Sequence, residues 1–582
     1  MISDVCDNSG AELRSRVERI LLSDVMLPGQ YIGGELGSVV KDRSGVRGRF
    51  CFAFPDVYTI GMSNYGLQLL YAIMNRRDDW ACERVFMPYP DMENSLRKNG
   101  LPLYSLETFT PLSEFDVIGF SLQYEMSFTN VLTILDLGGI PIHCVDRSMS
   151  FPLVVAGGPS AANPEPMSDF IDLFMIGDGE ELLPLVCASW LELRLGQSDI
   201  SRRDALLEMG RRFKNVVVPR FYSVQYNANG LANCPKPTEQ GLPEIICPAI
   251  IDDIEKYEPP VNRIVPFIEC VHDRVSIEVM RGCPGRCKFC VSTVQKKPLR
   301  FRSPESIVQF AYQSSLATGS KEVSLLSLST SDYPKLDDLL TKLRETLTPL
   351  GVTISVPSLR VNRQLSDMMQ KLTTERTSGL TLAPEAARDE MRQRIGKPIT
   401  NENLLAGCET AFANGFNRVK MYFLCGLPDE TEADIDGIID LSVEIMKLGK
   451  KIRGRNPIVT TNVSNFVPKP HTAWERVGMQ SRQYFKEVHN RLVNQAKRTG
   501  ISLKYHSLDT SLLEAFICRA DRRAGQVIER AWQLGARLDA WSDYFQNNIW
   551  QQAINESGLN VAQIVHTDIQ ETDELPWEHV RY

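Results

Sequence analysis

The chain has 582 residues, of which 43% are hydrophobic and 23% charged, and its net charge is −8. This length exceeds what one hydrophobic core supports, so two to four domains are expected. The acidic balance argues against broad nonspecific binding of nucleic acids, and the sequence has no apolar run of membrane-span length. The 14 cysteines form no disulfide-like framework, which favours a reducing compartment and, by default, a cytoplasmic location.

The first 200 residues are expected to form an extension and one α/β domain. Residues 1–45 are the N-terminal extension, with helical spacing of apolar residues from 11 to 22. In residues 46–200, buried strand-like runs alternate with helical patterns, which predicts a doubly wound, Rossmann-like parallel sheet. The expected strands are 50–54, 116–122, 153–159 and 173–181, and the expected helices include 67–74 and 130–137.

Small residues stand at the carboxyl ends of three of these strands. Ligands of doubly wound sheets bind beyond those ends, and glycine lets the backbone approach a ligand closely. The candidate cofactor-binding residues here are Ser121, Gly157, Gly158, Gly177 and Gly179. Tight strand-to-helix turns that bind nothing are the alternative interpretation.

The rest of the chain is expected to hold a joint, a second α/β unit and a helical end. Residues 201–270 are the linker or joint region, and residues 501–582 are the helical C-terminal region. Between them, residues 271–500 alternate strands and helices as in a partial (β/α)6 barrel. The six expected strands are 276–280, 322–329, 353–356, 378–382, 418–424 and 459–466.

Three cysteines follow the first of these strands within eight residues. Cys283, Cys287 and Cys290 give the spacing C-x-x-x-C-x-x-C on a loop that contains proline and glycine. A closed structural zinc site needs four ligands, so three thiols suggest a cluster with one open position. A zinc-binding loop or three reduced structural thiols are the alternatives.

This spacing resembles the signature of the radical S-adenosylmethionine (radical SAM) superfamily, in which an aromatic residue such as Phe289 often precedes the third cysteine. The resemblance implies that the three cysteines each bind one iron of a [4Fe-4S] cluster. It also implies that S-adenosylmethionine chelates the fourth iron and is cleaved by an electron from the cluster to methionine and a 5′-deoxyadenosyl radical. Phe289 would then lie at the cofactor.

The resemblance also assigns roles to residues at the ends of the barrel strands. Ser327 and Ser329 stand where the superfamily contacts the amino group of S-adenosylmethionine, and Gly426 stands near its adenine. Glu385 is expected to bind the cofactor or act on substrate, whereas Arg360 and His471 are candidate catalytic or substrate contacts. Helix caps for the serines, an ion-paired Arg360 and a loop position for His471 are the alternatives.

Residues 30–582 are similar to a largely uncharacterised bacterial radical SAM family with an N-terminal cobalamin-binding-like domain. The strings that carry this similarity are 30–35, 157–159, 176–180, 383–386 and 466–472. The cobalamin-binding motif D-x-H-x-x-G is absent, and Asn64 stands where members of the family usually have a histidine. Cobalamin is therefore one possible cofactor, bound without a histidine ligand from this loop.

The sequence thus predicts a radical SAM enzyme that modifies an unidentified substrate, which is a small molecule, an RNA or a protein. Cobalamin-dependent methyl transfer is one route. The alternatives are methylthiotransferase-like modification of RNA or protein, for which Cys51, Cys82 and Cys144 are too scattered to indicate a second cluster, and a non-catalytic zinc or iron–sulfur binding module. The resemblance further implies an electron donor such as flavodoxin or ferredoxin, and no membrane partner is expected.

Overall fold

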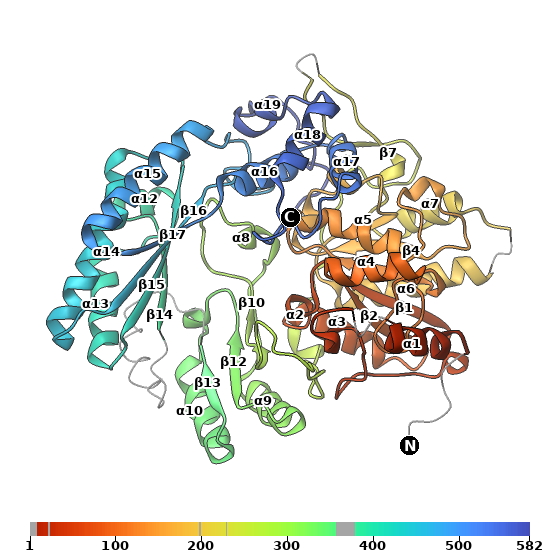
Figure 1. The fold of residues 1–582 in the computed structure, drawn as a ribbon, viewed down its shortest axis with the longest axis horizontal. Coiled ribbons are helices and arrows are strands. Elements are labelled where there is room, and N and C mark those ends of the chain that lie inside the picture. Colours follow the sequence, from red (N-terminus) through yellow and green to blue (C-terminus); the bar gives the residue numbers. More distant parts are fainter. Residues whose placement is uncertain (1–7, 21–23, 197–198, 228–229, 357–378) are drawn as a thin grey trace.

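The structure is a computed structural model that describes residues 8–20, 24–196, 199–227, 230–356 and 379–582. Figure 1 shows a doubly wound domain on the right, in red to yellow, and two further sheets, green and cyan, below and on the left. The C-terminal helices, in blue, lie at the top between them. No helix among the described residues has the length and apolar character needed to cross a membrane.

The N-terminal domain is built on a six-stranded sheet with the order β2-β1-β3-β4-β5-β6. Neighbouring strands are parallel except β6, which is antiparallel to β5. The order 2-1-3-4-5 is that of a doubly wound fold whose switch point lies between β1 and β3. The strands are β1 (Gly48–Phe54), β2 (Trp80–Phe86), β3 (Val117–Ser121), β4 (Leu153–Gly157), β5 (Leu173–Met175) and β6 (Val216–Val217).

The four strands expected in this domain are confirmed as β1, β3, β4 and β5, because each is a run of buried apolar residues. Strand β2 was missed, since it buries the charged pair Glu83 and Arg84 in its middle. Arg84 is compensated by Glu35 at 2.9 Å and Glu107 at 2.6 Å, which explains how a strand with two charges is fully buried.

Helices connect the strands of this sheet. Helices α3 and α6 pack on each other and on β1, whereas α4 packs on α5. The helices are α1 (Asn8–Ile20), α2 (Tyr58–Gly61), α3 (Tyr65–Asn75), α4 (Pro90–Asn99), α5 (Phe128–Leu137), α6 (Gly179–Gly196) and α7 (Arg202–Arg212). The predicted helices at 67–74 and 130–137 are confirmed as α3 and α5.

The segment predicted as a joint is tied to both halves of the chain. It contributes β6 to the N-terminal sheet and a small hairpin of β7 (Tyr222–Ser223) and β8 (Lys236–Pro237). Isolated bridges join Ala249 to Gly177 and Ile246 to Val580. The segment is therefore packed against the domains and is not a free linker.

The second half holds two parallel sheets, seen in Figure 1 in green and cyan. One has the order β13-β12-β9 and the other β14-β15-β16-β17. Residues 357–378, between β13 and β14, lie outside the described residues, and Arg360 and the start of the strand expected at 378–382 fall in this range. The strands are β9 (Val275–Glu278), β12 (Glu322–Leu326), β13 (Thr353–Ser355), β14 (Leu380–Glu385), β15 (Arg418–Cys425), β16 (Ile458–Asn465) and β17 (Ser502–Tyr505).

The six strands predicted for the partial barrel are thus found in chain order, with differences at the edges. The first expected strand is divided between β9 and the short β10 (Met280–Arg281), which pairs with β11 (Arg300–Phe301). Strand β17 was not predicted, because its four residues are mostly exposed. The helices of this half are α8 (Ser292–Gln295), α9 (Pro304–Thr318), α10 (Leu336–Leu347), α12 (Asp389–Arg394), α13 (Asn401–Ala413), α14 (Glu432–Arg453) and α15 (Arg482–Thr499).

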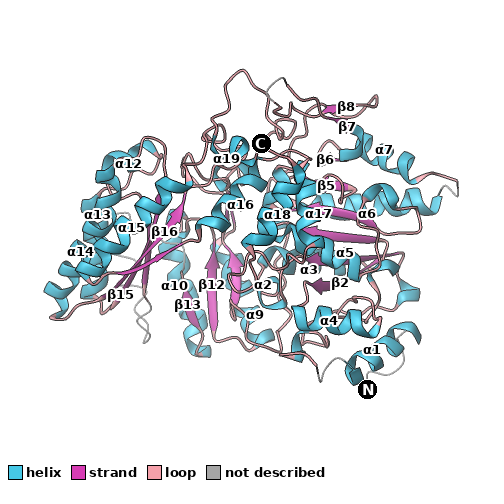
Figure 2. Cartoon of the chain, turned by 45° about the horizontal axis from the view of Figure 1, so that its top comes forward, coloured by secondary structure: helices cyan, strands magenta, loops and turns pink. Residues whose placement is uncertain are grey.

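The C-terminal helices α16 and α17 pack on the N-terminal domain, as the tilted view of Figure 2 shows, and α18 packs on α17. Helix α17 contacts α5, and Asn130 and Thr129 of α5 bond to the backbone of Leu538 and the carboxylate of Asp539. The helical C-terminal region that the sequence predicted therefore closes over the first domain. Its helices are α16 (Leu508–Arg519), α17 (Ala524–Gln533), α18 (Asn547–Ser557) and α19 (Val561–His566).

Candidate radical SAM site

The three cysteines lie on the loop between β10 and α8. Cys287 is buried, and Cys283 and Cys290 are partly exposed. The end of the loop is closed by the hydroxyl of Thr293, which donates to the carbonyl oxygen of Cys290 at 2.7 Å. Three thiols on one loop, two of them partly exposed, match the donor set of a cluster that keeps one iron open to another ligand. The residues present therefore fit a [4Fe-4S] cluster.

The cysteine loop is held against the barrel. The backbone N–H of Lys288 donates to the carbonyl oxygen of Ile395 at 3.0 Å. Gly396 lies so close that an added Cβ would come within 2.3 Å of the carbonyl oxygen of Arg286. Phe289 packs against a small apolar cluster that includes Phe466 and Leu427, both at ends of barrel strands. The loop is thus anchored where the barrel strands end.

A buried ion-pair network links the loop to the N-terminal domain. Arg281, two residues before Cys283, contacts Asp178 at 3.1 Å and Glu180 at 2.6 Å. Arg300 of β11 contacts Asp178 from the other side at 2.5 Å. Burial acts to raise the pKa of Asp178, but the two arginines outweigh it and hold that pKa below its usual range.

This network occupies the strand end at which Gly177 and Gly179 were predicted to bind a cofactor. Gly177 has φ = 104° and forms a bridge to Ala249, so its backbone already has a close neighbour. An added Cβ on Gly179 would contact the side chain of Leu70 at 3.2 Å. Both glycines are used for packing in this structure.

The other three predicted residues of this domain lie together at the ends of β3 and β4. The hydroxyl of Ser121 accepts from the side-chain amide of Gln123 at 2.7 Å. Gly157 pairs with Ser121, and Gly158 has φ = 101° and turns the chain beside Leu122. Their neighbours Gln123 and Pro159 line a cavity of about 300 Å³.

That cavity lies between three parts of the chain. The ends of β3 and β4 contribute Gln123 and Pro159, and α8, which follows the third cysteine, contributes Val291 and Gln295. The third part consists of Lys469, Pro470 and residues of α16. The side-chain amide of Gln295 donates to the carbonyl oxygen of Pro159 at 3.0 Å and so joins the first two parts.

Asn64 lies in the turn between α2 and α3, where the family usually has a histidine. The side chain of Asn64 caps α3 by accepting from the backbone N–H of Leu67 at 2.9 Å. His143, the only histidine of this domain, instead contacts Glu529 at 3.2 Å.

At the barrel strand ends, Ser327, Ser329 and Gly426 make local hydrogen bonds. The hydroxyl of Ser327 bonds to Thr330 at 2.8 Å, and that of Ser329 donates to Asp332 at 2.5 Å. The backbone N–H of Gly426 donates to Glu430 at 2.6 Å. All three lie where the sequence places them, in loops that follow β12 and β15.

The predicted acid and base residues at the next strand ends differ in their surroundings. Glu385 ends β14 with φ = 65° and pairs with Lys397 at 3.0 Å, while burial raises its pKa. His471 has φ = 65°, its Nε2 bonds to the carbonyl oxygen of Ala162 at 3.0 Å, and burial lowers its pKa. Ala162 lines the cavity, so His471 joins the barrel loop to the end of β4.

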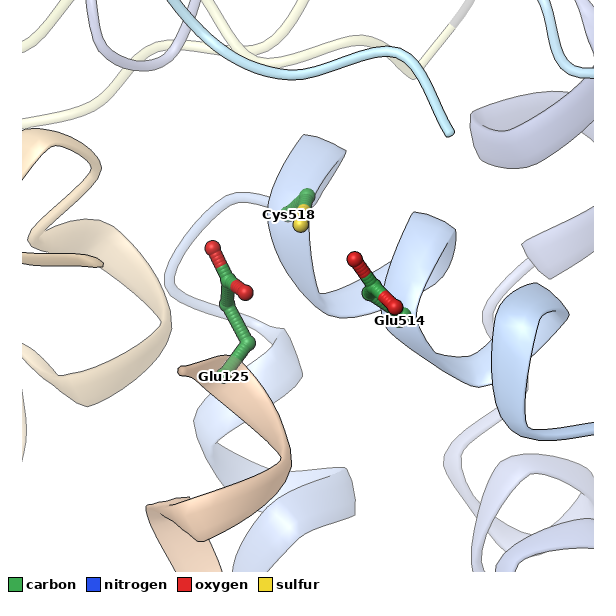
Figure 3. Close-up of side chains that lie close together, drawn as sticks. All are labelled: Glu125, Glu514 and Cys518. Atoms are coloured by element: carbon green, nitrogen blue, oxygen red, sulfur yellow. The ribbon is translucent and has the colours of Figure 1, made fainter. Parts of the chain in front are cut away.

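The sequence alone did not indicate the polar wall of the cavity. Figure 3 shows three of its residues, Glu125, Glu514 and Cys518. Glu125 follows β3, and the other two lie on α16, far along the chain. Lys469 stands in one of the strings that carry the family similarity, and that was the one available signal. Residues this distant in sequence become a cluster only through the packing of α16 on the first domain.

Two family models match the chain. Residues 66–219 match the family described as "Radical SAM proteins, N-terminal", and residues 277–442, which contain the three cysteines, match the "Radical SAM superfamily".

Curated relatives are archaeal and bacterial. An uncharacterized protein of Methanocaldococcus jannaschii is 26% identical over 73% of this chain and 83% of its own length. An uncharacterized methyltransferase of Pyrococcus horikoshii is 24% identical over 43% of this chain and 52% of its length. The ribosomal protein uS12 methylthiotransferase RimO of Desulfotalea psychrophila is 25% identical over 30% of this chain and 40% of its length. The chain thus spans about half or less of the latter two.

Among solved structures, the radical S-adenosylmethionine methyltransferase TsrM of Kitasatospora setae, with cobalamin and a [4Fe-4S] cluster bound, has a TM-score of 0.49 at 15% identity and covers 74% of each chain. The superfamily match and the cysteine loop point to the same chemistry, because the matched residues include the three cysteines. The chain carries a radical SAM domain and is a radical SAM enzyme, with a [4Fe-4S] cluster and S-adenosylmethionine as its cofactors.

Proposed function

We propose that this enzyme modifies its substrate in the cavity between the cysteine loop and the ends of β3 and β4. The observation that carries the proposal is the composition of the cavity wall. Val291 and Gln295 come from the helix that follows the third cysteine, and Pro159 and Ser160 come from the end of β4. A ligand in this cavity would lie beside both the cluster loop and the doubly wound domain.

The position between the cysteine loop and the doubly wound domain suits radical chemistry. The bound cluster supplies the electron that cleaves S-adenosylmethionine, and a reactive organic radical must be kept from water and from side reactions. Glu385 at the end of β14 and Lys397 after α12 form a partly buried pair near the anchored loop, and His471 fixes the barrel loop to the cavity wall. These residues hold the two halves of the site together.

The first test is reductive cleavage of S-adenosylmethionine by the full chain. Anaerobically reconstituted protein should hold about four irons and, with dithionite, release 5′-deoxyadenosine, or S-adenosylhomocysteine if it is a methylase. Replacing Cys283, Cys287 and Cys290 together by alanine should remove the iron and both products, because only thiolates at this loop hold the cluster. Iron and product are measured on the same samples.

The matched control is Cys247→Ala, since Cys247 is exposed and lies outside the loop. It should keep iron and product formation. An intact cluster without either product would contradict catalysis and favour a binding module. One zinc in place of iron would point to a zinc-stabilised loop.

Cobalamin-dependent methyl transfer is the second candidate. It is supported by the doubly wound sheet, whose switch point is a general ligand site, and by the methyltransferase name of one relative. Because Asn64 caps α3, a corrin at this edge would have no histidine ligand from that loop.

Hydroxocobalamin retained by the full chain through gel filtration, with a cobalt spectrum that lacks histidine ligation, would support methyl transfer. The full chain is needed because α16 and α17 cover part of the first domain. Loss of the cofactor on the column would leave an enzyme that uses S-adenosylmethionine alone.

Methylthio transfer finds less support, although two relatives are named methylthiotransferases. It would need a second cluster, and burial raises the pKa of Cys51 and Cys82 well above the usual value and that of Cys144 to about 11. Thiols that stay protonated are poor iron ligands. About eight irons per chain, instead of about four, would favour this alternative.

Further parts of the prediction stay proposals. They are membership of the family with a cobalamin-binding-like domain, although the relative that matches 73% of this chain is archaeal, and the domain limits 46–200, 201–270, 271–500 and 501–582. A flavodoxin or ferredoxin as electron donor and a cytoplasmic location, suited to an oxygen-labile cluster, complete the set.

A further inference from the structure

The cavity beside the cysteine loop has one strongly polar wall. Its polar side chains are Tyr124 and Glu125, which follow β3, Lys469 from the loop after β16, and Glu514 and Cys518 of α16. Figure 3 shows Glu125 facing Glu514 and Cys518, and the ligand atoms of these three residues lie within 4.8 Å of one another.

Hydrogen bonds already engage most of this wall. The Nζ of Lys469 donates to Oε2 of Glu125 at 2.9 Å and to Sγ of Cys518 at 3.0 Å, and it forms an ion pair with Oε1 of Glu514 at 2.7 Å. The hydroxyl of Tyr124 donates to Oε2 of Glu514 at 2.5 Å. Three groups of the wall thus already surround the ammonium of Lys469. Glu125 and Glu514 together have four carboxylate oxygens. Three of them contact Lys469 or Tyr124, and Oε1 of Glu125 contacts neither.

The wall carries an excess of negative charge. Burial lowers the pKa of Lys469, but Cys518 and the two glutamates outweigh it and hold that pKa well above its usual value. Burial and Glu125 keep the pKa of the Cys518 thiol well above its usual value, so the thiol stays neutral. Two carboxylates against one ammonium leave one uncompensated negative charge.

Apolar side chains also line the cavity, among them Phe128, Val291 and Ile517, and its volume of about 300 Å³ is at the lower end of what small ligands need. The two carboxylates are largely buried and share one ammonium, so a ligand cation placed against them would compensate the remaining negative charge.

We propose that this cavity binds a substrate that carries a protonated amine on an apolar body, with the amine against Glu125 and Glu514. The inference rests on the proposed function, because it names the substrate class of the same site. A ligand carboxylate is disfavoured, since it would approach two carboxylates that share a single ammonium. A divalent ion is disfavoured because the ammonium of Lys469 already fills the space between the three possible metal ligands.

The test compares three ligands of the same shape. Full-length, anaerobically reconstituted protein is titrated by calorimetry with 2-phenylethylammonium, 2-phenylethanol and 3-phenylpropanoate, which share a phenyl body and differ in charge. The amine should bind about tenfold or more tightly than the alcohol, and the carboxylate should bind most weakly. Equal binding of amine and alcohol, or tightest binding of the carboxylate, would overturn the proposal.

Variants assign the charge to its residue. Glu125→Gln should remove most of the roughly tenfold preference for the amine and leave the affinity for the alcohol unchanged, because the shape of the cavity is kept. Glu514→Gln should act in the same direction and serves if the first variant does not fold. Glu529→Gln, on α17 and outside the cavity, is the matched control and should keep the preference.

Two further outcomes separate this inference from others. Uptake of one zinc that displaces the amine and depends on Glu125 and Cys518 would show a metal site and overturn the inference. Binding is measured without turnover, so S-adenosylmethionine cleavage without amine preference would refute the inference alone. Amine preference without cleavage would refute the proposed function alone.

Discussion

Glu430 is a single residue whose protonation the fold moves into the neutral range. Burial raises its pKa to about 7, while the hydroxyl of Tyr484 at 2.5 Å and the backbone N–H of Gly426 at 2.6 Å act to lower it. The carboxyl follows β15, close to the strand end where the adenine of S-adenosylmethionine is expected. It therefore connects the stability of this loop to pH.

The sign of the effect follows from the raised pKa. Between about pH 4.5 and pH 7 the folded chain holds a proton on Glu430 that the unfolded chain has released, so stability falls as pH rises through this window. Glu430→Gln removes the titration and still accepts both hydrogen bonds. We expect the difference in unfolding free energy between variant and native chain to change by up to about 3 kcal/mol across the window.

Urea unfolding at pH 5 and pH 7 measures this difference. Glu432→Gln is the control, because the side chain of Glu432 is 83% exposed, and its pH profile should follow that of the native chain. Parallel profiles for native chain and Glu430→Gln would contradict the raised pKa.

At the scale of elements, the end of β5 and the hairpin of β10 and β11 act as one unit. Asp178→Asn removes the carboxylate that pairs with the buried Arg300, whereas Arg281 keeps its ion pairs with Glu180 and Glu278. Leaving a buried charge such as Arg300 without its partner costs on the order of 3–5 kcal/mol. Since Arg281 precedes the first cysteine of the loop, the variant should also retain less iron after reconstitution.

Thermal unfolding and iron content check this prediction together. Asp252→Asn, at an exposed carboxylate in the joint segment, should leave both unchanged. A variant at Asp178 with native stability but reduced iron would separate loop positioning from stability, and native values of both would show that the network is dispensable.

In the first domain, the strands that the sequence predicted correctly are runs of mostly buried apolar residues, such as β1 or β4, and in the second half β15 and β16 alternate buried residues with more exposed ones. The strands that it missed, β2 and β17, lack this pattern. Two buried charges interrupt β2, and most of β17 is exposed. Hydrophobic periodicity reports burial, so it fails where burial is achieved by ion pairs or where a strand lies at an edge.

The site was predictable only where its chemistry is local in sequence. The three cysteines are close together in the chain, and their spacing alone indicated the cluster loop. Lys469 and its partners Glu125 and Glu514 come from three distant segments, and no spacing rule joins them. Gly177 likewise gave a signal for a tight backbone, but the backbone of Ala249, in the joint segment, is its neighbour.

In the whole molecule, the two ends of the chain pack against each other. The C-terminal helices pack on the first domain and bring α16 to the cavity, so residues 501–582 complete a site that begins with β3 and β4. Asp539 marks this contact. It is buried, it accepts from Thr129 at 2.6 Å and from the indole N–H of Trp550 at 2.8 Å, and burial raises its pKa.

Thr129→Val tests how strongly this long-range contact holds the molecule together. Valine keeps the shape of threonine but removes the donor, which leaves a buried carboxylate oxygen with one partner fewer. Such a change costs about 1–3 kcal/mol, and it should loosen the C-terminal region first. We therefore expect a lower unfolding temperature and faster proteolysis within residues 501–582. Thr341→Val is the matched control, because the hydroxyl of Thr341 donates to the carbonyl oxygen of Asp337 on an exposed helix surface and should be replaceable at little cost. If both variants unfold and are cleaved like the native chain, the C-terminal helices are held by apolar packing alone, and the buried carboxylate contributes nothing to their attachment.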